Sequence, residues 1–253
     1  MKRPWRCAYL LESLALLLGL SLPALAEEKL RIVTEELPPF NMTIDGHLTG
    51  LCTEIVEAIL DEIGETATIQ SMPWARAYDI ATNTENVLIY CMARTASREL
   101  KFKWVDTIAQ TDWYLFSLNP NLRLNSLDEA RRLQIATVKD DAGEQYLIGQ
   151  GFAVGQNLQS SNKYEHNYEK LLLGRVDLWI ANEPNAVYLV RSAGQDPAQT
   201  LHRALALANL GGARGLSMAF SLKTPDATVE RFRTGLQKIR ASGRYDTITR
   251  KWQ

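Results

Sequence analysis

The sequence predicts an α/β fold made of two similar units. In the first unit, short β-rich runs alternate with segments of helical periodicity. One of these runs, at 87–92 (VLIYCM), is continuously apolar, as in strands that are buried on both faces. The same alternation returns further along the chain. Strand–helix–strand order of this kind indicates parallel sheets with right-handed crossovers.

The elements of the first unit can be assigned in order. A β-rich run at 30–34 is followed by a tight-turn signal at Asp45-Gly46. A helix is expected between Gly50 and Gly64, because its apolar residues recur at helical spacing: Ile55, Val56, Ile59, Leu60 and Ile63. A strand at 67–72, a helix at 74–81 after Pro73, and the strand at 87–92 complete this unit.

The second unit repeats the pattern. We expect strands at 113–118, 134–138 and 176–181 and helices at 125–132, 142–149, 164–173 and 184–192. Near the C-terminus, residues 215–221 are strand-like, and helices are expected at 229–241 and 245–252.

Two strand-like segments, 113–118 and 215–221, connect the units, and such connections fit a hinge between two lobes. Movement about such a hinge changes φ and ψ at a few residues. Gly211, Gly212 and Gly215 are placed to absorb this change, because glycine adopts either sign of φ at low cost. We therefore assign residues 27–115 and 216–253 to lobe I, and residues 116–215 to lobe II.

Residues 1–26 have the features of a secretory signal peptide. Basic residues precede an apolar core at 14–22, and Ala24 and Ala26 frame a cleavage site. The apolar core is roughly half of the ~20 residues that a membrane span needs. We therefore expect cleavage after Ala26 and export to the periplasm, with no part of the mature protein embedded in the membrane.

The composition excludes several functional classes. Without residues 1–26, the chain carries 25 basic and 28 acidic residues, a net charge of −3. This balance gives no basic footprint for nucleic acid and no polybasic membrane patch. The three histidines are scattered, so no metal site or other cofactor is expected. Aromatic residues are numerous, and such rings often line pockets for small ligands.

Two cysteines, Cys52 and Cys91, remain after removal of the signal peptide. In an oxidising compartment an even pair is a disulfide candidate. The alternative is two buried free thiols. Sequence alone does not decide, because it does not give the distance between the two Cα atoms.

Five short motifs occur along the chain in a familiar order. They are 30–34 with Pro38-Pro39-Phe40, Gly50 before a helix, Thr95-Ala96-Ser97-Arg98, Gly174-Arg175-Val176-Asp177, and Ala241-Ser242-Gly243-Arg244-Tyr245 with Lys251-Trp252. In these motifs residues 30–253 resemble a bacterial extracellular solute-binding protein of family 3, the type that includes periplasmic polar-amino-acid-binding proteins. The resemblance implies a two-lobed periplasmic-binding-protein type II fold. In that fold the lobes close on a ligand in the cleft between them.

The same resemblance suggests ligand-binding residues in lobe I. It places Arg98 as the clamp for a ligand carboxylate, which a guanidinium binds through two parallel hydrogen bonds. Thr95 would add a hydroxyl donor, and Phe40 and Trp74 align with aromatic residues that sandwich the ligand. Arg94 is a second anion-binding candidate from its position alone, since it follows the carboxyl end of the buried strand. For each of these residues, core packing or a solvated surface is the alternative.

Lobe II departs from the family pattern. The position where amino-acid binders usually carry an Asp holds Asn182, so the following Glu183 is a candidate for the same role. Asp140 and Asp141 replace residues that usually help to hold the carboxylate. Asp141 therefore either faces the cleft or only caps the helix at 142–149, where acids are favoured.

The leading functional hypothesis is a monomeric, non-enzymatic binding protein that delivers a small polar solute to the permease of an ABC importer. Glu35 and Glu36 add acidity to lobe I, so a ligand with a cationic end fits better than a dicarboxylate. One alternative is an enzyme similar to cyclohexadienyl dehydratases, with Glu183 or Asp141 as the acid–base residue. Another is a free-standing sensory protein, because we find no second domain in the sequence.

Overall fold

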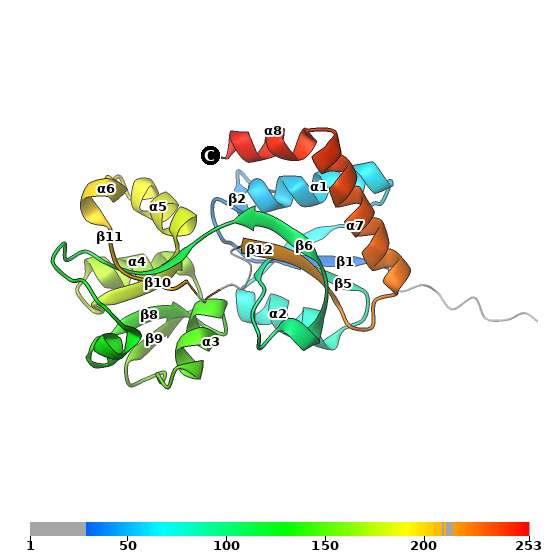
Figure 1. Ribbon diagram of the computed structural model, residues 1–253. Helices are drawn as coiled ribbons and strands as arrows, with labels where there is room; N and C mark the ends of the chain where they lie inside the picture. Colours follow the sequence, from blue (N-terminus) through cyan, green and yellow to red (C-terminus); the bar gives the residue numbers. More distant parts are fainter. Residues whose placement is uncertain (1–28, 209, 211–214, 253) are drawn as a thin grey trace, which may run out of the picture.

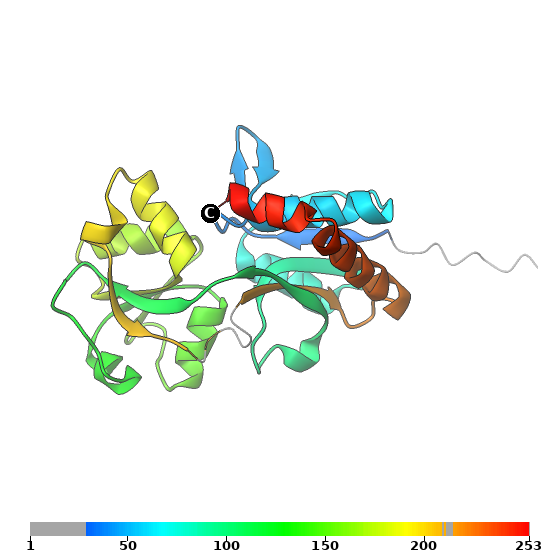
Figure 2. The same cartoon turned by 45° about the horizontal axis from the view of Figure 1, so that its top comes forward.

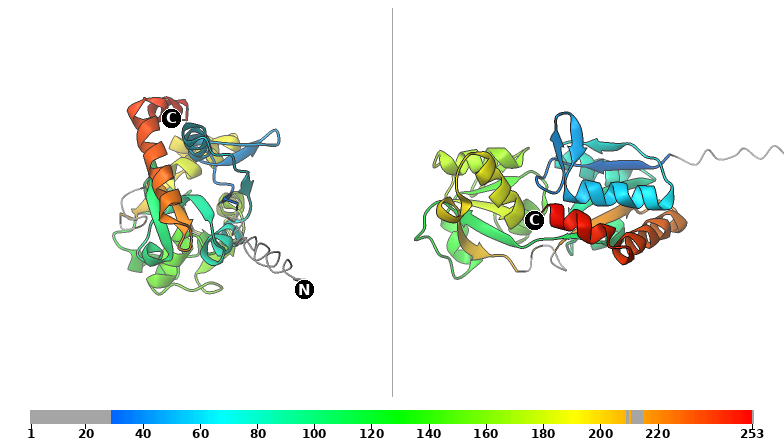
Figure 3. Two further views of the ribbon diagram at one scale, coloured as in Figure 1. Left: turned by 90° about the vertical axis from the view of Figure 1, so that its right-hand side faces the viewer. Right: turned by 90° about the horizontal axis from the view of Figure 1, so that it is seen from above.

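Two five-stranded sheets lie side by side in the computed structural model, which describes residues 29–208, 210 and 215–252 (Figures 1 and 3). The strand order is β4-β1-β5-β12-β6 in one sheet and β11-β7-β10-β8-β9 in the other. We call the parts of the protein built on them lobe I and lobe II, respectively. The expected signal peptide at 1–26 and the expected hinge residues Gly211 and Gly212 lie outside the described residues.

Lobe I contains a mixed sheet. Its strands are β1 (Arg31–Thr34), β4 (Ile69–Ser71), β5 (Val87–Ala93), β6 (Phe102–Gln110) and β12 (Gly215–Ser221). The three strands of the expected strand–helix–strand unit are parallel, since β1 pairs in parallel with both β4 and β5. In contrast, β12 runs antiparallel to both β5 and β6, so the expectation of a parallel sheet holds for only part of lobe I.

Helices cover both faces of this sheet. One face carries α1 (Leu51–Ile63), α7 (Asp226–Ala241) and α8 (Arg244–Lys251), and the other carries α2 (Trp74–Asn83) (Figure 1). The apolar residues that predicted α1 point into the core, where the side chains of Ile55, Val56 and Ile59 are fully buried. Burial of these side chains stabilises the lobe by roughly 1.5–3 kcal/mol for each residue.

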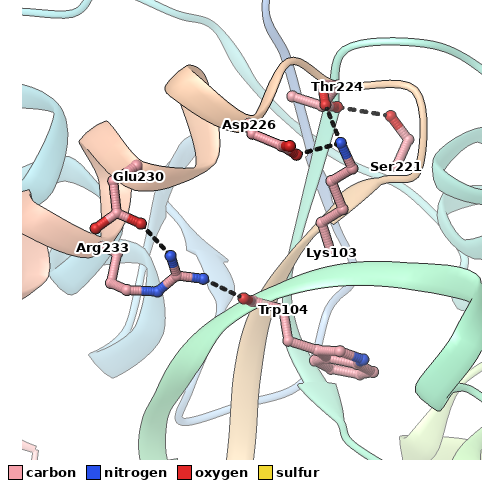
Figure 4. Close-up of polar contacts among 7 residues, drawn as sticks. All are labelled: Lys103, Trp104, Ser221, Thr224, Asp226, Glu230 and Arg233. Carbon is pink, nitrogen blue, oxygen red and sulfur yellow. Dashed lines mark hydrogen bonds and ion pairs between the residues drawn. The ribbon is translucent and has the colours of Figure 1, made fainter.

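A polar network attaches the start of α7 to the edge strand β6 (Figure 4). The Lys103 ammonium donates to the Thr224 carbonyl oxygen at 2.8 Å and pairs with the carboxylate of Asp226. About two turns further on, Arg233 donates to the Trp104 carbonyl oxygen at 2.9 Å and pairs with Glu230. These contacts hold α7 against β6, the edge strand of the sheet.

Lobe II has the same layered architecture. Its strands are β7 (Trp113–Ser117), β8 (Ile135–Val138), β9 (Leu158–Ser161), β10 (Leu178–Asn182) and β11 (His202–Ala206). This sheet is mixed too, because β8 is parallel to β9 and β10, whereas β7 runs antiparallel to β10 and β11. Its helices are α3 (Ala142–Gly149), α4 (Tyr164–Leu172), α5 (Glu183–Ser192) and α6 (Pro197–Thr200).

The fold also contains two short 3-10 helices, η1 (Glu99–Lys101) and η2 (Leu127–Arg132). A hairpin of β2 (Met42–Ile44) and β3 (His47–Thr49) projects from the molecule (Figure 2).

The chain crosses from lobe I to lobe II at Thr111 and Asp112, between β6 and β7. The lobe boundary that the sequence predicts after residue 115 therefore falls inside β7. Gly215 begins β12, and a Cβ atom there would lie 2.5 Å from the Ala109 carbonyl oxygen. The structure thus gives Gly215 a packing role in the β12–β6 pairing. Across the described ranges, no helix is both long enough and apolar enough to cross a membrane.

Candidate functional site

A small cavity lies between the two lobes. Its volume is about 10 Å³, which is room for about one water molecule. Lobe I lines it with Glu35, Leu37, Trp74, Cys91, Ala93, Arg98 and Leu216, and lobe II lines it with Trp113, Asp141, Ala142 and Tyr164. We call this the interlobe cavity. It is the place where buried ionisable groups of both lobes meet.

Arg98 is the cation of the interlobe cavity. It follows β5, and its side chain is almost completely buried, with 1% of the residue exposed. Its Nη1 donates to the Ala93 carbonyl oxygen at 3.3 Å, and its Nε donates to Gln145 Oε1 across the lobe boundary at 3.2 Å. Its Nη2 donates to the Asp140 carbonyl oxygen, also in lobe II, at 3.2 Å. The guanidinium has five N–H donors, so two are not used in these bonds among the described residues.

The Asp140 carbonyl oxygen joins the lobes. It accepts hydrogen bonds from Trp74 Nε1 at 2.7 Å and from Arg98 Nη2, both in lobe I, and from Gln145 Nε2 at 2.9 Å. Asp140 presents this oxygen from a left-handed backbone conformation with φ of 59°. The Arg98 guanidinium also lies 4.9 Å from the ring centre of Trp74 and 5.1 Å from that of Tyr78, within the range of cation–π attraction.

Two carboxyl groups and a phenol face Arg98 in the interlobe cavity. Glu35 follows β1, Asp141 precedes α3, and Tyr164 begins α4. The Tyr164 hydroxyl donates to Glu35 Oε1 at 3.3 Å. Burial raises the pKa of Asp141 to about 7, and burial together with the nearby Asp141 carboxylate raises the pKa of Glu35 well above its ordinary range. Near neutral pH the Asp141 carboxyl group is therefore poised to give up a proton.

The sequence left open whether Asp141 faces the cleft or caps the helix at 142–149, and in the structure it does both. Its Oδ1 accepts from the Glu144 backbone N–H at 2.7 Å, which is an N-cap of α3. Its Oδ2 is buried without a hydrogen-bond partner among the described residues, and the side chain lines the interlobe cavity. A buried carboxylate oxygen without a partner is costly, and a ligand donor would remove that cost.

The two cysteines meet at the wall of the interlobe cavity. Cys91 lies in β5 at a bulge opposite β12 and has a φ of 63°. Its Sγ lies 2.8 Å from the Sγ of Cys52 in α1, and both residues are buried thiols in the structure. Burial raises the pKa of the Cys91 thiol well above its usual value. The pair is close enough for a disulfide, which stays a prediction.

Three residues suggested for lobe I lie outside the interlobe cavity. Phe40 is buried, with 2% exposed, and lines a different pocket. Arg94 is on the surface, where it pairs with Glu99 at 2.5 Å. Thr95 is half-buried and its hydroxyl lies 3.0 Å from that of Ser97. Of the suggested lobe I residues, the structure therefore brings only Trp74 and Arg98 into the cavity.

In lobe II, the structure separates the two residues at the end of β10. Asn182 is fully buried, and its side-chain oxygen accepts from the Asn185 backbone N–H at 3.0 Å as the N-cap of α5. Glu183 turns outward and forms an ion pair with Arg203. It lines a pocket on the outside of lobe II. The candidate role of Glu183 as the anion of the cleft does not fit this position.

Tyr164 and Trp113 belong to the cavity, but their sequence patterns did not mark them. The sequence predicts a helix at Tyr164 and a strand at Trp113, so both fit ordinary core residues. Glu35 was noted for its charge alone. Among the described residues, no group of histidine, cysteine or acidic side chains is arranged to hold a metal ion.

Known proteins provide an independent comparison. The family model for bacterial extracellular solute-binding proteins, family 3, matches residues 30–253. A histidine kinase sensor domain with similarity to periplasmic binding proteins superposes with a TM-score of 0.76 at 17% identity, over 88% of this chain and 95% of that one. A comparison with curated protein sequences finds no significant match.

Two amino-acid-binding proteins have similar folds. An ancestral arginine-binding protein, solved with arginine, gives a TM-score of 0.75 at 18% identity over 88% of this chain and 97% of that one. The arginine-, lysine-, histidine-binding protein ArtJ from Geobacillus stearothermophilus gives 0.74 at 17% identity over 88% and 95%. These superpositions confirm the two-lobed type II fold that the sequence predicts, and with the match over residues 30–253 they show that the chain belongs to family 3 of the bacterial extracellular solute-binding proteins.

Proposed function

We propose that the protein captures a small solute that carries both an amine and a carboxylate, and that its lobes close on this solute. One observation carries the proposal. A buried guanidinium, that of Arg98, and two buried carboxyl groups, those of Glu35 and Asp141, converge on one cavity between the lobes. Family membership supports a binding function, since most of the similar structures are those of binding proteins.

The charges of the interlobe cavity favour a zwitterionic ligand. A ligand carboxylate would take the two free N–H groups of Arg98, and a ligand ammonium would pair with Asp141 and Glu35. The ammonium would stabilise the ionised form of these acids, because an opposite charge nearby lowers a carboxyl pKa. Binding near pH 7 should therefore release protons, and affinity for an amine should rise as the pH rises through 7.

Entry of the solute requires that the lobes separate. The cavity has room for about one water molecule, so even a small amino acid must displace the bonds that Trp74 and Arg98 make to the Asp140 carbonyl oxygen. A solute shifts the lobes toward closure only by its differential affinity for the closed form. Contacts to Arg98 in lobe I and Asp141 in lobe II supply that difference.

We propose an exported, periplasmic and monomeric protein, with residues 1–26 as its signal peptide. The likeness to extracellular solute-binding proteins supports export. The partner of the loaded form would be the permease of an ABC importer. A second candidate role is presentation of the solute to a separate receptor, and the similarity to a histidine kinase sensor domain favours it.

Binding fits this site better than catalysis. A dehydratase-like reaction would need an acid–base residue in the cavity, and Asp141, with a pKa near 7, has the protonation behaviour for it. However, Glu183, the other candidate, is in an ion pair outside the cavity, and Oδ1 of Asp141 accepts from the Glu144 N–H, which leaves only Oδ2 to meet a solute.

A thermal-shift screen followed by calorimetry tests the proposal. The mature protein is screened against amino acids, diamines and dicarboxylates. A zwitterionic ligand at 100 times its Kd should stabilise by about 2.7 kcal/mol. Replacement of the clamp in Arg98→Ala should cost roughly 2–5 kcal/mol of binding.

Arg94→Ala is the matched control, because Arg94 follows the same strand but lies outside the cavity and pairs with Glu99. It should keep wild-type affinity. Equal affinity of the Arg98→Ala and wild-type proteins, or stabilisation by dicarboxylates alone, would contradict the proposed ligand class.

A further inference from the structure

A second and much larger pocket also lies between the lobes. Its volume is about 520 Å³, within the range of roughly 300–1,000 Å³ that is usual for small-molecule sites. Lobe I contributes the end of β6, the start of α1 and helix α8, and lobe II contributes α5. Figures 1 and 3 show α5 and the end of α8 facing each other across the junction of the lobes. We call this the α5–α8 pocket.

Aromatic rings form much of its wall. Phe40, Tyr245 and Trp252 come from lobe I, and Tyr188 comes from lobe II. Phe40 is the residue that the family resemblance suggested for ligand stacking, and here it faces a pocket other than the interlobe cavity. Rings offer large apolar contact area at low entropic cost, so this wall suits a flat aromatic group.

The charged side chains that line the α5–α8 pocket are all basic. Its lining residues include Arg191 and Lys251 but neither Asp nor Glu. Lys251 is already paired with Glu54 at 2.6 Å. Within the described part of the chain, no carboxylate pairs with Arg191, which lies in the last turn of α5. The Arg191 guanidinium is therefore the available partner for an anion, with the donor geometry that suits a carboxylate.

A neighbouring pocket differs from the α5–α8 pocket in the charges of its lining residues. It is about 630 Å³ and lies on the outside of lobe II. It shares Arg191 with the α5–α8 pocket, but Glu183 and Asp196 also line it, and it presents Arg123 and Arg203. Its charges are mixed and Arg203 is paired with Glu183, so no single class of ligand follows from its chemistry.

We propose that the α5–α8 pocket is a binding site for a small aromatic carboxylate. The ring lies between the aromatic walls and the carboxylate pairs with Arg191. Because Tyr188 and Arg191 belong to lobe II while Tyr245 and Trp252 belong to lobe I, an occupant bridges the lobes and favours the arrangement in which they form one pocket. This site is separate from the interlobe cavity and does not depend on the solute proposed for that cavity.

Three ring-matched compounds test the proposal by calorimetry on the mature protein: 2-naphthoate, 2-naphthamide and 2-naphthylmethylamine, which are anionic, neutral and cationic. We expect saturable binding of naphthoate at one site. Its affinity should be at least tenfold higher than that of the amide, and the amine should bind more weakly than the amide. Arg191→Ala should weaken naphthoate binding at least tenfold, because it removes the charge-assisted hydrogen bonds to the carboxylate. Arg191 is exposed, so this variant should fold like the wild type.

A further variant locates the compound. Arg123→Ala removes an exposed arginine that lines only the neighbouring pocket, and should leave naphthoate binding unchanged. The proposal is overturned if naphthoate shows no saturable binding, if the three compounds bind equally, if Arg191→Ala binds like the wild type, or if Arg123→Ala abolishes binding.

Discussion

The raised pKa of Asp141 makes the stability of the folded protein depend on pH, and Asp141→Asn should remove this group's share of the dependence. The replacement keeps the shape of the side chain and an oxygen that can accept from the Glu144 N–H, so the cap of α3 is preserved. It removes the proton that the buried carboxyl group must lose as the pH rises.

The magnitude follows from the two pKa values. The pKa of Asp141 rises from its ordinary value of 3.8 to about 7 in the folded protein. At 1.36 kcal/mol for each pH unit, this difference corresponds to at most about 4 kcal/mol. It is an upper limit, because separation of the lobes would let water reach the ionised carboxylate.

The sign is that of a destabilising group. Between pH 4 and pH 7 the unfolded chain has already lost the Asp141 proton, while the folded protein still holds it. The folded state binds more protons, so the free energy of unfolding falls as the pH rises through this window and levels off above 7. Asp141→Asn should follow a flatter curve and gain on the wild type as the pH rises.

Urea denaturation of both proteins between pH 4.5 and pH 8 measures this difference. Asp140→Asn is the control, since Asp140 is exposed and asparagine tolerates its left-handed backbone. This control should keep the wild-type pH dependence. If the wild-type and Asp141→Asn curves run parallel within about 0.5 kcal/mol, the buried-carboxyl reasoning fails.

Two further predictions concern backbone and thiols. Gly50→Ala should destabilise the fold by about 3 kcal/mol or more, because its φ is 115° and a Cβ atom would lie 2.5 Å from the Phe40 carbonyl oxygen. Gly46→Ala, at a φ of 80° with nothing within 4 Å of the new atom, should cost only about 1 kcal/mol in the same urea experiment. Thiol titration of unfolded, unreduced protein should find no free thiol at Cys52 and Cys91, whose sulfur atoms are already adjacent. Two reactive thiols would exclude the disulfide.

The periodicity of the sequence predicted the framework of both lobes. The helix that begins at Leu51 and the buried strand at Val87–Ala93 were expected from apolar spacing, and the structure has them at these positions. Pairing direction was harder to predict. The last strand, Gly215–Ser221, returns to lobe I from lobe II and runs antiparallel to its neighbours, and no local pattern reports such a long-range connection.

The site was predicted residue by residue with mixed outcomes. Arg98, which the motif suggested as a carboxylate clamp, lines the interlobe cavity, whereas Arg94 lies outside it, and the clamp role of Arg98 stays a prediction. Both residues follow the carboxyl end of the same strand, which lies near the crevice between the lobes. The turn after the strand determines which of their side chains reaches the cavity. Glu183 is the first residue of the helix that Asn182 caps, and it forms an ion pair with Arg203 outside the cavity. Tyr164 could not be identified, since its role depends on contact with Glu35, 129 residues away in sequence.

The central claim is that both lobes close on a solute held by buried charges, and small-angle scattering tests it most directly. The mature protein is measured alone and with a saturating amount of the solute that the screen identifies. The account predicts that the radius of gyration falls when this solute is added, and that Arg98→Ala needs a higher concentration for the same change. A scattering curve that saturating solute leaves unchanged would contradict the closing cleft.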